Sequence, residues 1–154
     1  MQRRSFIKGV AAVAAVTAVT PSATFAAGKP KGKNAMSFKS ALNAITGGKT
    51  PTKSGKVKLK APEIAENGAV VPIKVTVDSP MTDANYVKAI HVLGMKNGNA
   101  RCVSIALSPA NGKAVFGTRI RLASTQDIMA VAEMSDGSFL SASANVKVTI
   151  GGCG

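Results

Sequence analysis

Apolar residues recur with two different periods along this chain, and each period predicts a different kind of element. Between residues 37 and 45 the apolar side chains follow helical spacing on one face, at Phe38, Ala41, Leu42 and Ile45. Ser37 is a suitable N-cap for this amphipathic segment, and the pair Gly47-Gly48 is a suitable end. The pattern therefore predicts one short helix in the N-terminal third of the chain.

From Lys56 onward the period changes to two, because apolar residues alternate with polar ones. Turn residues such as Asn67-Gly68 and Asp136-Gly137 divide this alternation into short segments. The candidate strands are residues 56–60, 71–77, 87–93, 102–107, 114–122, 128–134 and 138–150. About seven short strands at this spacing predict an all-β domain that folds as an antiparallel two-sheet sandwich, without a second domain or an internal repeat.

The first 26 residues have the order of a bacterial export signal. Arg3 and Arg4 form a twin-arginine pair, an Ala/Val-rich run covers residues 10–19, and small residues precede a cleavage position after Ala26. The run is too short for a membrane span, which needs roughly 20 apolar residues; an uncleaved N-terminal anchor is the alternative. The paired arginines favour the Tat route, so we expect the mature protein in the periplasm.

These patterns divide the chain into a Tat signal peptide (1–26), a basic mobile arm with the short helix (27–55), the β-sandwich (56–150) and a C-terminal tail (151–154). The formal net charge of +13 is local, because residues 27–60 hold nine lysines and no acid, while residues 61–154 are nearly balanced. Without Trp and with Tyr86 alone, a nucleic-acid stacking surface is not expected. We interpret the arm as solvated chain; docking to an acidic partner or screening of an anionic adduct is the alternative.

Most enzyme signatures are missing from the sequence. His91 is the single histidine and lies in a strand-like segment, where a structural role is the usual one. No cysteines have the C-x-x-C spacing of a thioredoxin-type site, and no phosphate-binding or dinucleotide-binding loop is present. We therefore expect no cofactor, no metal site and no catalytic residue in this chain.

The C-terminal sequence Gly151-Gly152-Cys153-Gly154 carries the candidate chemistry. Glycines add nothing to a core, so we expect a thin, flexible tail that places the thiol up to about 10 Å from the domain. An exposed cysteine forms thiolate in part near neutral pH and can bond to other sulfur species. The alternative is a structural disulfide to Cys102, which we otherwise expect to be a free, mostly buried thiol in its strand.

The sequence resembles the SoxY family, whose members carry sulfur in bacterial thiosulfate oxidation. The resemblance runs through most of the mature chain and includes residues 61–68, 75–81, 118–123, 131–139 and 148–153. It implies an immunoglobulin-like sandwich that forms a heterodimer with SoxZ and holds sulfur covalently on Cys153. This chain has only Gly154 after the cysteine, whereas the family motif usually ends in two glycines.

The resemblance also implies an ordered set of partner enzymes. A SoxXA-like haem enzyme would join thiosulfate to Cys153, a SoxB-like thiosulfohydrolase would release sulfate, and in some organisms a SoxCD-like dehydrogenase would oxidise the remaining sulfur. The chain itself would then be a carrier and not an enzyme. The competing hypothesis is a periplasmic binding or interaction module whose terminal cysteine only crosslinks subunits.

Overall fold

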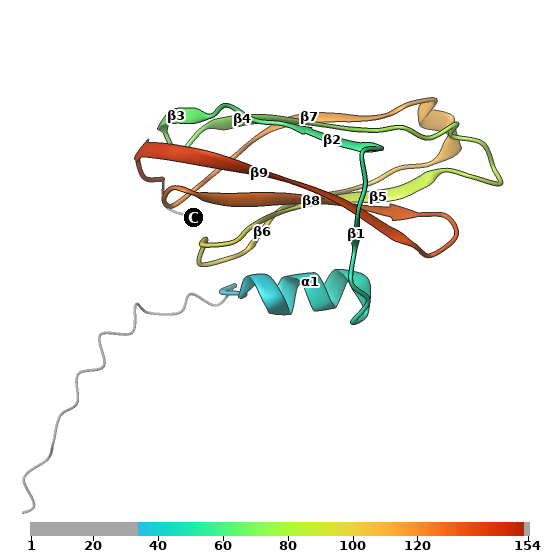
Figure 1. Cartoon of the computed structure of the whole chain (residues 1–154), viewed down its shortest axis with the longest axis horizontal. Coiled ribbons are helices and arrows are strands. Elements are labelled where there is room, and N and C mark those ends of the chain that lie inside the picture. The colour runs from blue at the N-terminus through green and yellow to red at the C-terminus, as the bar shows by residue number, and fades with distance from the viewer. Residues whose placement is uncertain (1–33, 153–154) are drawn as a thin grey trace, which may run out of the picture.

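The alternation that begins at Lys56 becomes a series of strands in the computed structural model, which describes residues 34–152 (Figure 1). One helix, α1 (Phe38–Thr46), and a 3₁₀ turn, η1 (Pro109–Asn111), complete the elements of this part of the chain. The strands, in chain order, are β1 (Thr52–Lys53), β2 (Val57–Lys60), β3 (Ile64–Asn67), β4 (Val71–Val77), β5 (Val87–Gly94), β6 (Arg101–Ala106), β7 (Ala114–Ile120), β8 (Gln126–Met134) and β9 (Phe139–Ile150). All the predicted strands are present, with small differences at their ends.

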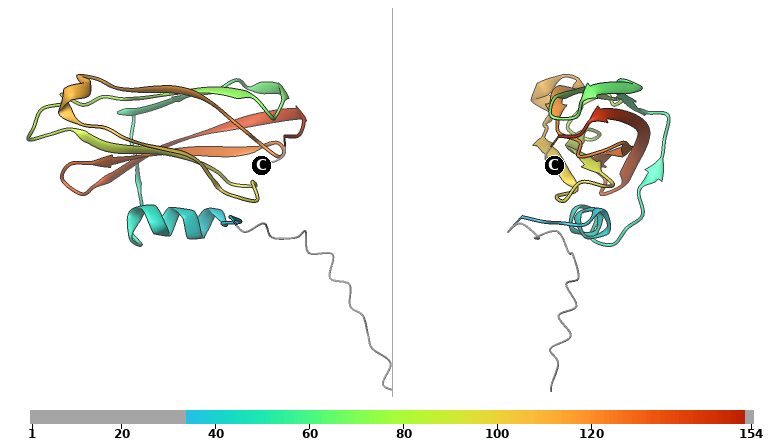
Figure 2. Two further views of the ribbon diagram at one scale, coloured as in Figure 1. Left: turned by 180° about the vertical axis from the view of Figure 1, so that it is seen from behind. Right: turned by 90° about the vertical axis from the view of Figure 1, so that its left-hand side faces the viewer.

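The strands form two facing layers, which Figures 1 and 2 show from three sides. The larger sheet has the order β1-β9-β8-β5-β6, with β3 also paired to β9, and the smaller sheet has the order β2-β4-β7. The pairings among the predicted strands are antiparallel, which confirms the predicted sandwich.

Two strands were not predicted, and both pair in parallel with β9. β1 lies beside the beginning of β9, and β3 lies beside its end. Each is short and mostly exposed, so neither carries the alternating apolar pattern by which the other strands were recognised. Their partner is therefore set by the position of β9 and not by their own sequence.

The core lies between the two sheets and is built mainly from β-branched and small apolar side chains. β4 buries every second residue, namely Val71, Ile73, Val75 and Val77. From the facing layer, β8 contributes Ile128, Ala130 and Ala132. A register slip of one residue would turn such a set toward water, so the alternation decides which face of each strand points inward.

Helix α1 packs on the outer side of the larger sheet (Figure 2). The Ser37 hydroxyl oxygen accepts a hydrogen bond from the Ser40 N–H at 3.2 Å, and Gly47 ends the helix with a φ of 63°. Both observations confirm the predicted cap and end. Ala41 packs with Leu93 and Ala100 in a small second cluster. Within residues 34–152, no helix is long and apolar enough to cross a membrane.

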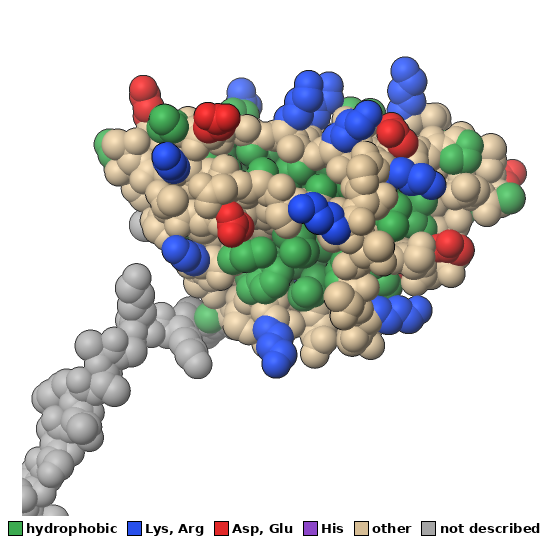
Figure 3. All heavy atoms as spheres, in the orientation of Figure 1, with side chains coloured by type: hydrophobic (Ala, Val, Ile, Leu, Met, Phe, Trp, Pro, Cys, Tyr) green, Lys and Arg blue, Asp and Glu red, His purple; other side chains and the backbone are tan. Residues whose placement is uncertain are grey.

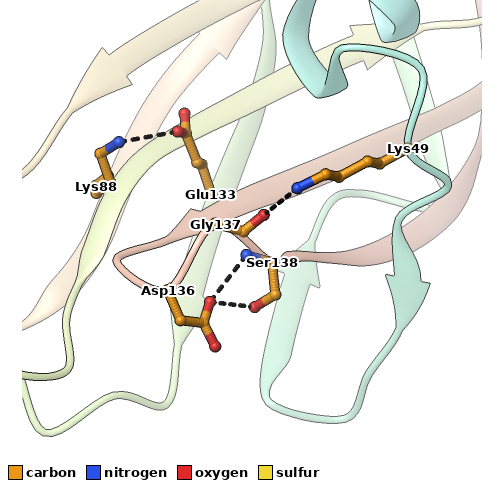
Figure 4. A network of polar contacts seen from close by, with 6 residues as sticks. All are labelled: Lys49, Lys88, Glu133, Asp136, Gly137 and Ser138. Carbon is orange, nitrogen blue, oxygen red and sulfur yellow. Dashed lines mark hydrogen bonds and ion pairs between the residues drawn. The ribbon is translucent and has the colours of Figure 1, made fainter.

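The turn between β8 and β9 is closed by contacts of polar groups (Figure 4). Asp136 accepts hydrogen bonds from the hydroxyl of Ser138 at 2.6 Å and from its N–H at 2.8 Å, and these bonds lower the pKa of the carboxyl group. The Lys49 ammonium donates to the Gly137 carbonyl at 3.4 Å and so connects the segment after α1 to this turn. The turn is thus held by local bonds at the surface.

Candidate functional site

The candidate site is the end of β9, where the sequence analysis places the Gly151-Gly152-Cys153-Gly154 tail. Cys153 and Gly154 lie outside the described residues, as do Arg3 and Arg4 at the other end of the chain. The structure follows the backbone as far as Gly152 and therefore shows the frame from which the cysteine-bearing end departs.

Three segments that are far apart in the sequence meet at this frame. The N–H of Gly68 donates to the carbonyl of Ile150 at 2.7 Å, and the N–H of Leu122 donates to the carbonyl of Gly68 at 2.7 Å. The N–H of Gly152 then donates to the carbonyl of Leu122 at 2.9 Å, which closes a ring of backbone bonds. We call these four residues (Gly68, Leu122, Ile150 and Gly152) the tail junction. Because Gly68 follows β3 and Leu122 follows β7, the junction ties the end of β9 to both sheets.

The glycines of the tail junction are required by the close approach of backbone to backbone. A Cβ on Gly68 would collide with the Leu122 carbonyl oxygen and would lie 2.8 Å from the Gly152 nitrogen. A Cβ on Gly152 would lie 2.6 Å from the Ala69 nitrogen, and one on Gly151 would collide with the carbonyl oxygen of Ala123. The sequence predicts a thin, flexible tail that adds nothing to the core; within the described residues, Gly151 and Gly152 lie close against the backbone of Ala123 and Ala69.

The loop after β7, which contacts the tail glycines, is held by the side-chain amides of Asn97 and Gln126. Asn97 donates to the Arg121 carbonyl at 2.8 Å and accepts from the Ala123 N–H at 3.0 Å and from the Gln126 amide at 2.8 Å. Gln126 is buried, and its own oxygen accepts from the Lys96 N–H at 2.8 Å. Buried polar groups that are fully paired in this way hold a loop in one position. By sequence alone, Asn97 and Gly68 are turn residues and Gln126 carries no signal, so the pattern does not indicate their part in holding this loop.

Cys102 lies in an irregularity of β6. Val92 pairs with Val103 and Leu93 pairs with Arg101, so Cys102 between them has no partner across the ladder. As a result Cys102 and Val103 are both half-buried, and the expected alternation of one buried and one exposed side chain is wrong here.

The environment of Cys102 favours the neutral thiol. Burial raises its pKa, and hydrogen bonds from the Asn97 side chain and the Gly94 backbone oppose this only in part. The sulfur lies 3.5 Å from the Asn97 amide nitrogen, and the cysteine is free in the described part of the chain. Cys102 is half-buried and not, as predicted, mostly buried, and its alternative partner, Cys153, lies outside the described residues. A thiol held neutral is a poor nucleophile, so the surroundings of Cys102 disfavour a reactive sulfur at this position.

His91 has the surroundings of a structural residue. Its Nδ1 lies 2.8 Å from the hydroxyl of Ser104 on the neighbouring strand. Burial lowers its pKa, the charge of Glu133 opposes this effect, and the charge of Arg101 adds to it. Among residues 34–152, no group of three or more His, Cys, Asp or Glu side chains is placed to hold a metal ion.

Comparison with known proteins gives one family and one fold. The family model described as "Sulfur oxidation protein SoxY" matches residues 42–153. The structure of the sulfur carrier protein SoxY from Chlorobium limicola f. thiosulfatophilum is 31% identical, with a TM-score of 0.61, and the match covers 73% of this chain and 96% of that one. No match was found among curated proteins.

Superoxide reductases share the fold at lower identity. The enzyme from Ignicoccus hospitalis is 17% identical with a TM-score of 0.51, and the match covers 60% of this chain and 80% of that one. A putative superoxide reductase from Thermotoga maritima is 19% identical with a TM-score of 0.51, covering 60% and 84% of the two chains. At this identity the likeness shows the sandwich alone and says nothing about chemistry.

Proposed function

The chain belongs to the SoxY family of sulfur oxidation proteins, and from that premise we propose that it holds thiosulfate-derived intermediates covalently on Cys153. The observation that carries this proposal is the extent of the family match, which reaches Cys153 itself. The similar protein from Chlorobium limicola is a sulfur carrier by its description. A carrier of this kind is the substrate of its partner enzymes and needs no catalytic machinery of its own.

The tail junction supports the proposal because it holds Gly152, the residue directly before Cys153, at the end of β9. Gly152 is held by a single backbone hydrogen bond to Leu122, and Cys153 is the next residue. A single bond of this kind contributes only about 1 kcal/mol net, so thermal motion can release the end of the chain. Once released after Ile150, the thiol would reach up to about 10 Å from the sandwich. The segment after Ile150 would then lie against the domain between reactions and extend from it during them.

The chemistry proposed for Cys153 begins with two steps, and each step balances in atoms, charge and electrons. In the first, the cysteine thiol and thiosulfate form the S–S bond of a thiosulfonate, releasing one proton and two electrons to a haem-containing partner of the SoxXA kind. In the second, a SoxB-like hydrolase adds water across the sulfur–sulfonate bond, which releases sulfate and a proton and leaves a persulfide on the cysteine. A SoxCD-like dehydrogenase would oxidise that persulfide sulfur further. These steps need a thiolate that is accessible to enzymes and are thus unsuited to the half-buried Cys102.

Location and assembly belong to the same proposal. The Arg3-Arg4 pair and the apolar run behind it support export by the Tat pathway, so that the mature chain works in the periplasm. Membership of the SoxY family connects the chain with a Sox system, in which a SoxZ-like subunit forms the stable heterodimer. The enzymes that load and unload Cys153 would bind only transiently.

Intact-mass analysis of the protein isolated from cells growing on thiosulfate tests this function. We expect adducts with the mass of bound thiosulfate or of added sulfur, located on the terminal peptide and removed by reductant. Cys153→Ser should abolish the adducts and sulfur transfer, while the matched variant Cys102→Ser should retain both. A protein that carries only intermolecular disulfides at Cys153 would contradict the carrier function and favour a crosslinking role.

A further inference from the structure

We propose that the outer face of the small sheet is a docking surface for an acidic segment of a partner protein, centred on Gly117. This surface, called the basic face below, is defined by Lys58, Lys60, Lys74, Gly117 and Arg119, which lie on β2, β4 and β7. The proposal concerns where a protein partner binds and does not depend on the chemistry of Cys153.

The register of the small sheet places the cations of the basic face side by side. Lys60 lies directly opposite Lys74, and Lys74 in turn lies opposite Gly117 on β7. Arg119 follows two residues along the same face, opposite Pro72. The side chains of Lys60, Lys74 and Arg119 are all exposed. Figure 3 shows Lys and Arg side chains projecting along the side of the molecule that this sheet forms.

This arrangement works against the stability of the isolated sheet. Like charges directly opposite each other on neighbouring strands are destabilising, and Lys60 and Lys74 form such a pair. Lys58 is neutralised in part by Asp78 at 3.5 Å, whereas Lys60, Lys74 and Arg119 have no ion pair within the described residues. The uncompensated charge on a flat face is complementary to a surface that brings carboxylates.

Gly117 adds a second and independent indication. Its φ is not positive, the β4–β7 register runs through it without a bulge, and the nearest atom to an added Cβ would be the Ile73 carbonyl oxygen at an ordinary 3.8 Å. Neither backbone conformation nor packing therefore requires glycine here. A glycine inside a strand weakens the strand and often marks a place where another backbone approaches closely. At Gly117, on the edge strand β7, the outer face lacks a side chain beside Lys74, and this gap is called the notch below.

The notch favours a protein segment over a lipid surface. A bilayer recognises basic residues by charge and does not need a gap of one side chain between them, whereas a peptide backbone can lie in such a gap. Val115, two residues before Gly117, is 42% exposed and offers apolar contact at the same place. The outer side of the larger sheet is partly covered by α1, so the basic face is the open outer face of the sandwich.

Binding of a fluorescein-labelled oligoglutamate peptide to the mature chain, followed by fluorescence anisotropy at low salt, tests the proposal. The double variant Lys60→Gln/Lys74→Gln should weaken binding by about tenfold, because it removes Lys74, which lies beside Gly117, and Lys60, which lies opposite Lys74. It removes a repulsion and should fold at least as stably as the wild type. The matched control Lys39→Gln/Lys147→Gln, which removes the same charge elsewhere, should change binding by less than about twofold. Equal weakening by both double variants would overturn the proposal, because binding would then follow net charge alone.

Gly117→Thr tests the notch without changing charge. Threonine favours strands, so the midpoint of thermal unfolding should rise by about 2–4 °C, while peptide binding weakens severalfold because the notch is filled. Unchanged peptide binding in this variant would overturn the role of Gly117.

In a parallel arm, phosphatidylglycerol vesicles replace the peptide. Vesicle binding that Lys60→Gln/Lys74→Gln abolishes, without any binding of oligoglutamate, would assign the surface to lipid and overturn the protein partner.

Discussion

The two ends of β9 both depend on glycine, but for opposite physical reasons. Before β9 starts, Gly137 has a φ of 82°, and an added Cβ would meet nothing within 4 Å. After β9 ends, Gly151 and Gly152 have no positive φ, and an added Cβ would run into the backbone of another segment. Glycine is needed at the first end for a backbone angle and at the second end for space.

This difference changes the interpretation of the tail. By sequence alone, the tail glycines indicate only flexibility and thinness. The tail junction shows that the same absence of side chains lets the chain lie against Gly68 and Ala69 and hydrogen-bond to Leu122. In the described residues, the tail glycines therefore serve close backbone packing as well as thinness.

The largest expected effect is that of Gly68→Ala. Its methyl group would collide with the Leu122 carbonyl and press on Gly152, so that two segments must move. We expect the free energy of unfolding to fall by roughly 1–3 kcal/mol, measured by urea denaturation. Gly55→Ala is the matched control, since Gly55 has open space around it and no positive φ. Equal stability of the two variants would mean that the junction yields without strain.

Gly137→Ala tests the other end of β9 and should have the next largest effect. Alanine disfavours the left-handed region, so the variant should lose about 1 kcal/mol although nothing is crowded. Gly137→Asn should lose less, because asparagine adopts this conformation more readily. Thermal unfolding compares the two. Identical midpoints for both variants would contradict the assignment of the loss to the backbone angle at this turn.

Gly152→Ala should have a smaller effect on stability and a clear effect on the tail. Its methyl group would lie against the backbone of Ala69, but a chain end can move away, so the loss should stay below about 1 kcal/mol. Because the tail is then released, alkylation of Cys153 by iodoacetamide should accelerate. The rate is best measured by mass spectrometry in a Cys102→Ser background. An unchanged rate would favour a tail that never docks.

Ser138→Ala should have the smallest effect, on the titration of Asp136. The bonds from Ser138 lower the pKa of Asp136 in the folded protein, so they stabilise the fold above the unfolded-state pKa. This contribution is lost as the pH falls through the lowered pKa. Removing the hydroxyl should move the pKa of Asp136 toward its ordinary value, measured by NMR titration of the carboxyl carbon. A pKa that does not move would assign the shift to the backbone N–H alone.

Much of the fold could be predicted from the sequence because it depends on local patterns. The helix spacing around Ala41 and the alternation in β4 repeat with the geometry of the element itself, and Ser37 and Gly47 mark the helix ends by their own conformational preferences. These features need no knowledge of what lies opposite. The sandwich followed from the number and spacing of such strands.

The candidate site could be predicted only in part. The terminal Gly-Gly-Cys-Gly sequence could be recognised as a candidate site because it follows the last alternating strand and lacks that strand's apolar pattern. The importance of Gly68 was not visible, since its role depends on Leu122, more than fifty residues later in the chain. Asn97 and Gln126 were missed for the same reason, because a polar side chain acquires its role from the carbonyl or amide that happens to face it.

The sequence by itself therefore determined the helix and the seven alternating strands, the inward face of strands such as β4, and the cysteine on which the carrier hypothesis rests. The tertiary structure alone decided that β1 and β3 pair in parallel with β9, that Cys102 lies in an irregular part of the β6 ladder, and that the tail glycines lie against another backbone. The physical reason is the range of the interactions involved. Periodicity reports how a residue relates to its neighbours in the chain, whereas a close backbone approach depends on two segments whose separation in sequence carries no pattern.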